Sequence, residues 1–200
     1  MMKKKREQSP VFRRLEATFH RAYFLCKAAM SRSFSEIFFH PGSMTKILKE
    51  LSRHRLTLTV LEHTWQKPQQ HESKILSQRN GWGIGREVVM SGAGKPWLYA
   101  RTFFPESVVK AQGNDFLFLG SRPLGELLFS NPQVRRSDFT VAQLFPGHRE
   151  YQDAVKALQE APEYLWARRS EFYFPSGAIT LLEVFSPKME KAILRRELKK

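Results

Sequence analysis

The spacing of apolar residues predicts two helices in the first quarter of the chain. Apolar side chains recur every three or four residues from Phe12 to Met30 with basic residues between them, which is typical of a basic amphipathic helix. Ser43 is a suitable N-cap for a short helix over Met44–Leu51, whose apolar residues share one face. We expect both helices to dock on a core, although a basic amphipathic helix also suits a membrane surface or a partner.

Further along, apolar periodicity switches between strand and helix. Leu56–Leu61 alternates aliphatic and hydroxyl residues and predicts a strand with one buried face, and Arg136–Leu144 predicts another. The polar stretch Gln66–Asn80, which follows the first of these strands, is expected to be a loop. Pro123–Phe129 and Tyr151–Leu158 have the spacing and helix-forming residues of short helices. Strands and helices therefore follow one another without a repeated β-helix-β rhythm.

Two hairpins are the clearest local predictions. Ile84–Met90 and Trp97–Phe104 flank a glycine-rich turn, and Ala167–Phe174 and Ile179–Phe185 flank Pro175-Ser176-Gly177. Glycines 81, 83 and 85 lead into a strand, so they lack the helix N-terminus that a phosphate loop needs. The sequence predicts the α+β class, an antiparallel sheet of about six strands covered by helices.

Composition and charge argue against several classes of function. The 200 residues suit one domain, and 42% of them are apolar. The net charge is +14, but residues 1–55 carry +9, residues 186–200 carry +4 and the centre only +1, so the basic stripe of a nucleic-acid-binding domain is not expected. One cysteine and six scattered histidines fit neither a disulfide framework nor a metal site. No apolar run is long enough to cross a bilayer, and none suits a signal peptide.

Two charged residues lie inside otherwise apolar strands. Alternation places Arg86 on the same side as Val88 and Met90, and Glu183 on the same side as Leu181. An ionised group among aliphatic side chains is costly unless it is paired or binds a charged ligand. Pattern alone favours the plainer interpretation, in which each charge reaches solvent or pairs with a neighbouring side chain.

Several stretches together resemble the chorismate pyruvate-lyase family, whose members make 4-hydroxybenzoate for ubiquinone synthesis. The matching pieces occur in family order from about residue 43 to residue 187. They are Ser43-Met44-Thr45-Lys46; Arg86-Glu87 with Gly94-Lys95-Pro96-Trp97-Leu98, Ala100-Arg101-Thr102 and Pro105; Pro123-Leu124-Gly125 with Leu127-Leu128-Phe129; Trp166-Ala167-Arg168-Arg169-Ser170; and Leu182-Glu183-Val184-Phe185. The resemblance divides the chain into a basic, partly helical extension (1–42), a lyase-like domain (43–187) and a basic helical tail (188–200).

The resemblance implies an antiparallel sheet with helical flaps over a buried ligand site, and it implies roles for single residues. Arg86 matches the arginine that grips the ring carboxylate, and the backbone N–H of Met44 matches a second contact to that group. Glu183 matches the glutamate at the ring 4-hydroxyl, and Leu124 is expected on a flap over the ring. A guanidinium binds a carboxylate through two parallel hydrogen bonds, and a buried glutamate can orient a hydroxyl or move a proton.

The reaction implied is the conversion of chorismate to 4-hydroxybenzoate and pyruvate, and aromatisation drives it without a metal or other cofactor. Of Arg168 and Arg169, which point to opposite faces, at most one is expected to point inward, and Trp97 and Trp166 are expected in the core. The protein is expected to be a cytoplasmic monomer that binds chorismate and no nucleic acid, with peripheral membrane contact through its basic ends. The alternative is a non-catalytic effector-binding module like those of certain transcription regulators, although these carry a DNA-binding region longer than the 42 residues before Ser43.

Overall fold

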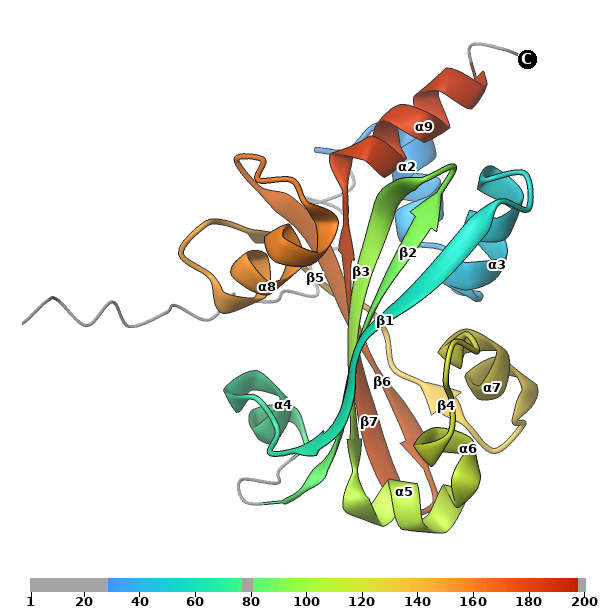
Figure 1. The fold of residues 1–200 in the computed structure, drawn as a ribbon, viewed down its shortest axis with the longest axis vertical. Coiled ribbons are helices and arrows are strands. Elements are labelled where there is room, and N and C mark those ends of the chain that lie inside the picture. Colours follow the sequence, from blue (N-terminus) through green and yellow to red (C-terminus); the bar gives the residue numbers. More distant parts are fainter. Residues whose placement is uncertain (1–28, 77–80, 198–200) are drawn as a thin grey trace, which may run out of the picture.

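A computed structural model describes residues 29–76 and 81–197, and in these residues seven strands form one sheet (Figure 1). The strand order is β1-β2-β3-β7-β6-β4, with β5 also paired to β6, and every pairing is antiparallel. The strands are β1 (Leu56–Gln66), β2 (Gly83–Gly92), β3 (Lys95–Pro105), β4 (Arg135–Arg136), β5 (Thr140–Leu144), β6 (Leu165–Phe174) and β7 (Gly177–Phe185). The predicted α+β class is confirmed.

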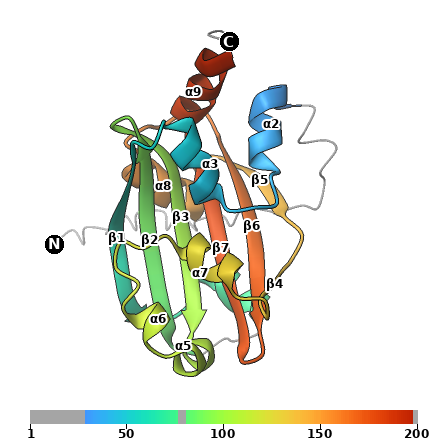
Figure 2. The ribbon, with the colours of Figure 1, turned by 90° about the vertical axis from the view of Figure 1, so that its right-hand side faces the viewer.

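Helices cover both faces of the sheet (Figures 1 and 2). Helices α2, α3 and α7 lie over one face, α4 and α8 lie over the other, and α5 closes one end. The helices are α2 (Arg32–Phe38), α3 (Met44–Leu51), α4 (Gln70–Ile75), α5 (Glu106–Gln112), α6 (Asn114–Leu117), α7 (Leu124–Ser130), α8 (Arg149–Leu158) and α9 (Pro187–Glu197). Apart from its last two residues, the helix expected over Phe12–Met30 lies outside the described residues.

Both predicted hairpins are present. In the first, β2 pairs with β3, and both turn residues have positive φ, 50° at Ala93 and 78° at Gly94. Gly94 adopts its angle at little steric cost because it has no Cβ. In the second, β6 pairs with β7, and Phe174 opposes Gly177 at the turn, where Gly177 has φ of 142°. These turns fix the register that decides which side chains share a face.

The strand predicted over Arg136–Leu144 is interrupted and forms β4 and β5. Ser137 causes the break, because its hydroxyl accepts a hydrogen bond from the Glu171 N–H and so takes part in the ladder itself. Its own N–H donates to the Glu171 carbonyl. Side chains of this kind compete with the backbone for ladder partners. The two short strands therefore both pair with β6, but at separate places.

The loop predicted over Gln66–Asn80 is wrong in part. Strand β1 continues to Gln66, and α4 follows with a capping box in which the Gln69 side chain and the Glu72 side chain satisfy each other's backbone N–H groups. Glu72 is buried and forms two hydrogen bonds with Arg101 on β3. The helix buries a charged residue, so its sequence lacks the apolar period by which helices are predicted.

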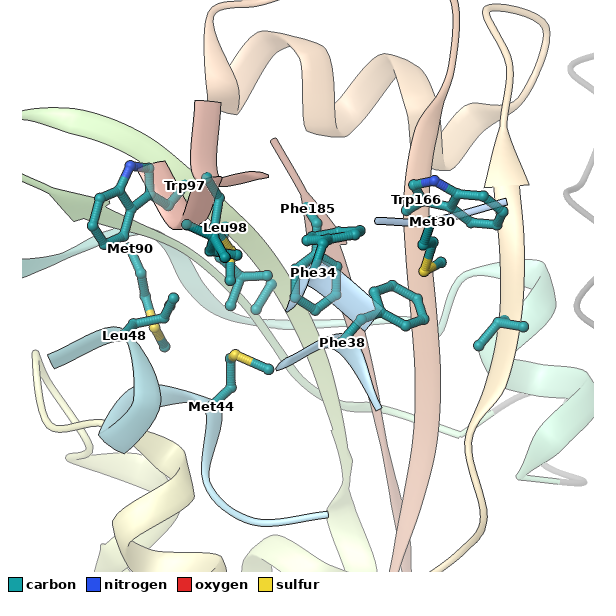
Figure 3. Close-up of a cluster of buried hydrophobic side chains, with 14 of the residues drawn as sticks. Met30, Phe34, Phe38, Met44, Leu48, Met90, Trp97, Leu98, Trp166 and Phe185 are labelled. Atoms are coloured by element: carbon teal, nitrogen blue, oxygen red, sulfur yellow. The ribbon is translucent and has the colours of Figure 1, made fainter. Parts of the chain in front are cut away.

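An aromatic cluster joins the helices to the sheet on the face that carries α2 and α3 (Figure 3). Phe38 is fully buried, and its ring centroid lies 4.8 Å from that of Phe185 and 5.7 Å from that of Phe34. Met189 and Ile193 of α9 are buried in the same cluster. Elements on either side of the 43–187 range therefore pack on the same core as the sheet.

Candidate active site

Residues of the sheet and of the helices α3 and α7 line a pocket. Both helices lie over the same face of the sheet (Figure 2). The empty space inside the pocket, with the open solvent at its mouth included, is about 570 Å³. All four residues predicted for the site line it. They are Met44, Arg86, Leu124 and Glu183. Its walls are otherwise largely apolar, including Val88, Met90, Ala100, Leu128, Phe172 and Leu181.

Arg86 reaches the pocket from β2, next to Val88 and Met90 as alternation predicts. It is 2% exposed, and its contacts are the Arg122 carbonyl at 3.4 Å and His63 Nδ1 at 3.5 Å. In residues 29–76 and 81–197, no carboxylate lies within salt-bridge distance of it. Burial lowers the pKa of Arg86 to about 10, so the guanidinium stays charged at neutral pH. A buried cation of this kind suits an anionic ligand.

His63 stands beside that guanidinium. Its Nε2 lies 3.1 Å from the Leu117 carbonyl, which accepts only if this nitrogen carries the proton, leaving Nδ1 as an acceptor toward Arg86. Burial and then the charge of Arg86 lower the pKa of His63. The ring is therefore neutral at pH 7 and leaves the positive charge of Arg86 unneutralised.

Glu183 reaches the same pocket from β7 and is held from the neighbouring strand. Arg168 of β6 pairs with it through two hydrogen bonds, Nε to Oε2 at 2.6 Å and Nη2 to Oε1 at 3.1 Å. Arg168 is fully buried and also donates to the carbonyls of Phe38 and His40. This bidentate pairing fixes the position of the Glu183 carboxylate.

Met44 and Leu124 come from the two covering helices. Met44 is the first residue of α3, where a backbone N–H has no partner inside the helix, and the Ser43 side chain does not cap it. Leu124 is the first residue of α7 and is buried. The helices touch, because Lys49 Nζ lies 2.8 Å from Glu126 Oε1 and a Cβ added to Gly125 would lie 2.8 Å from the Ser43 hydroxyl.

Arg136 is a pocket residue that the sequence patterns did not indicate. Its Nη2 lies 3.5 Å from Glu183 Oε2, and its guanidinium also lines the pocket. The pairing of Arg168 with Glu183 had a signal in the sequence, because a two-residue turn at 175–176 sets these residues opposite each other in the second hairpin. Arg136 had no such signal, because its place depends on the break at Ser137.

The remaining side-chain predictions concern packing. Trp97 and Trp166 are buried in the aromatic cluster and do not line the pocket, as expected. Arg168 points inward, and its neighbour Arg169 does not line the pocket. On the opposite face of the sheet, Arg101 is buried between Glu72 and Glu87, with Nη1 2.7 Å from Glu87 Oε1.

In the part of the chain that the structure describes, no helix has the length and apolar content needed to span a bilayer. Nor do these residues bring together three or more His, Cys, Asp or Glu side chains able to hold a metal ion.

The fold class is shared with two solved bacterial domains. The effector domain of PhnF from Mycobacterium smegmatis aligns with a TM-score of 0.56 over 74% of this chain and 90% of that one, at 13% identity. The C-terminal domain of the histidine utilization repressor from Pseudomonas syringae pv. tomato aligns with a TM-score of 0.53 over 68% and 94%, at 14% identity. At these identities the likeness shows a shared α+β fold and indicates no function or ligand for this chain.

Similarity in sequence identifies the protein family, which the shared fold does not. The family model for chorismate lyase matches residues 17–193. A probable chorismate pyruvate-lyase from a Shewanella strain is 36% identical over 76% of this chain and 80% of its own length. Another, from Pseudomonas putida, is 34% identical over 73% and 77%. The chain therefore belongs to the chorismate lyase family and is a lyase, which confirms the resemblance on which the residue assignments were made.

Proposed function

We propose that the chain converts chorismate to 4-hydroxybenzoate and pyruvate in the pocket between the sheet and helices α3 and α7. The observation that supports this is the placement of Arg86 and Glu183 in one pocket, on strands separated by β3. Arg86 opposes Thr102 of β3, and Glu183 opposes Ala100. Standard strand spacing puts their Cα atoms about 12 Å apart, which leaves room for a ring between the two side chains.

In this proposal the ring lies with its carboxylate at Arg86 and its 4-hydroxyl at Glu183. The guanidinium has few partners of its own and binds the carboxylate, which also receives the Met44 N–H at the first turn of α3. Leu124 covers the ring from α7. The apolar walls exclude water, so each charged contact is stronger than it would be in solvent.

The chemical step is an elimination. The bond between C3 and the ether oxygen breaks and its electron pair leaves on that oxygen, while the C4 hydrogen leaves as a proton and its bonding pair completes the aromatic ring. The departing enolpyruvate takes up a proton and tautomerises to pyruvate. The chain contributes by holding the ring and by positioning Glu183 at C4, where Arg168 fixes the carboxylate. Aromatisation supplies the driving force, so the proposal includes no cofactor.

The test is pyruvate release from chorismate by the purified protein, measured through lactate dehydrogenase. Arg86→Ala is expected mainly to raise KM and Glu183→Ala mainly to lower kcat. Arg135→Ala is the matched control, because this exposed arginine lies on β4 outside the pocket. Pyruvate formation no faster than the spontaneous rate with the unmodified chain would rule out the proposed activity, and exchanged effects of the two substitutions would rule out the proposed roles.

The likeness to the two regulator-type domains makes a non-catalytic effector module the second candidate. Its fold and pocket would be the same, but it would bind an anionic ring without releasing pyruvate. Calorimetric binding of 4-hydroxybenzoate by a chain that leaves chorismate intact would favour this second candidate.

The wider setting follows from the reaction. We propose that the protein acts in the cytoplasm as a monomer, binds no nucleic acid, and supplies 4-hydroxybenzoate for ubiquinone synthesis. Contact with anionic membranes would use the basic ends, of which residues 1–28 lie outside the described part. Sedimentation with anionic vesicles should fall when lysines and arginines in residues 1–28 are changed to glutamine, and unchanged sedimentation would contradict the membrane contact.

A further inference from the structure

The charges that line the pocket are unbalanced. Three arginines line it, at positions 86, 136 and 168, and among the described lining residues Glu183 is the only acid. The Arg168 guanidinium is committed, because it is fully buried and bonded to Glu183 and to two backbone carbonyls. Two positive charges therefore remain, one at Arg86 and one at Arg136, in a site with largely apolar walls.

Arg136 is held in place without being neutralised. Its Nε donates to the Ser170 hydroxyl at 3.1 Å and its Nη1 to the Pro41 carbonyl at 3.2 Å, both uncharged acceptors. Its Nη2 lies 3.5 Å from Glu183 Oε2, but that oxygen already accepts from Arg168 at 2.6 Å. The guanidinium thus has N–H donors left for a ligand.

Aromatic rings fix the orientation of this guanidinium. Its central carbon lies 4.1 Å from the centroid of Phe139 and 5.1 Å from that of Phe172. Burial lowers the pKa of Arg136 to about 10, which leaves it protonated at neutral pH. A cation that is oriented by rings, desolvated and only partly paired is suited to bind a planar anion.

We propose that Arg136 binds the carboxylate of the enolpyruvyl side chain of the substrate. The inference rests on the proposed function, which puts the ring 4-hydroxyl at Glu183. The enolpyruvyl ether leaves from C3, the ring carbon next to the one that bears the hydroxyl. Arg136 stands beside Glu183, at the end of the pocket assigned to the hydroxyl, so a substituent at C3 lies within its reach. Each of the two substrate carboxylates then has its own arginine.

Arg136 also acts in the elimination itself. When the bond from C3 to the ether oxygen breaks, its electron pair goes to the leaving enolpyruvate, whose negative charge increases while the C4 proton is lost. A guanidinium on the adjacent carboxylate stabilises that charge as it develops. The product 4-hydroxybenzoate keeps the ring carboxylate and loses the enolpyruvyl group. Arg136 therefore distinguishes substrate from product, whereas Arg86 binds both.

The experiment compares chorismate kinetics with product affinity in the same variants. Arg136→Gln should lower kcat/KM for chorismate by roughly 30-fold or more, as expected for removal of one partner from a buried charge pair. Its Kd for 4-hydroxybenzoate, measured by calorimetry, should stay within about threefold of the unmodified chain. Arg86→Gln should weaken both. Arg135→Gln, an exposed neighbour on the same strand, is the matched control and should change neither.

Arg136→Lys keeps the charge and should recover part of the loss, and thermal melting checks that each variant is folded. Equal losses for chorismate and 4-hydroxybenzoate in folded Arg136→Gln would show that Arg136 only supports Glu183, and an unchanged kcat/KM would show that it has no role. Either result overturns the inference while the unmodified enzyme still releases pyruvate. An unmodified chain that releases none would instead refute the proposed function, and this inference with it.

Discussion

Replacing Arg168 with methionine removes the cation that holds Glu183 in the interior. Methionine has a similar length and suits the apolar surroundings, so the main effect is on the carboxylate, which is 4% exposed. Removing one partner from a buried ion pair typically costs 3–5 kcal/mol. Arg136, 3.5 Å from Glu183, offsets part of this cost. We therefore expect the free energy of unfolding to fall by about 3 kcal/mol, a large share of the stability of a typical domain.

Urea titration followed by tryptophan fluorescence measures this change, because Trp97 and Trp166 are buried in the core. The double variant Arg168→Met/Glu183→Leu replaces the pair with apolar groups and should recover at least half of the loss, because no uncompensated carboxylate remains. A loss below about 1 kcal/mol for Arg168→Met, or a double variant whose loss equals the sum of the single losses, would refute this electrostatic explanation.

Three further predictions concern the core, the histidines and the helices over the pocket. Phe38→Ala should lower the free energy of unfolding by about 3–5 kcal/mol in urea titration, because the ring is fully buried, and a loss under 1 kcal/mol would contradict the packing. Burial lowers the pKa values of His63 and His71 in the folded chain. Below about pH 6.5 the two histidines therefore bind protons more readily in the unfolded chain than in the folded one. The free energy of unfolding should therefore fall from pH 7 to pH 5, and it should fall less in His71→Asn. A free energy of unfolding that does not change over this pH range would be inconsistent with neutral buried rings. Gly125→Val should raise KM for chorismate about tenfold by forcing α7 away from Ser43, and an unchanged KM would argue against contact of the helices over the ligand.

Much of the sheet could be predicted because its signals are local. Glycine-rich and Pro-Ser-Gly turns mark both hairpins, and alternation within each strand places Arg86 and Glu183 on the pocket side. Alternation alone cannot show that the two strands share one pocket, because that depends on the strand order across β3. The family resemblance supplied this information before the structure did.

The features that were missed depend on contacts between distant residues. Helix α4 buries Glu72, and the pairing with Arg101, 29 positions away, offsets the cost of burying its charge. Arg136 enters the pocket because Ser137 interrupts its strand and Ser170 binds its Nε. None of these contacts leaves a periodic pattern in the sequence, so periodicity predicts a loop in the first case and one continuous strand in the second.

The most direct test of the central claim follows both products of chorismate with the unmodified chain. The account predicts that pyruvate and 4-hydroxybenzoate form in equal amounts, and that Arg86→Ala and Glu183→Ala each lower kcat/KM at least tenfold while the exposed Arg135→Ala does not. Absence of both products, or full activity in the two pocket variants, would contradict it.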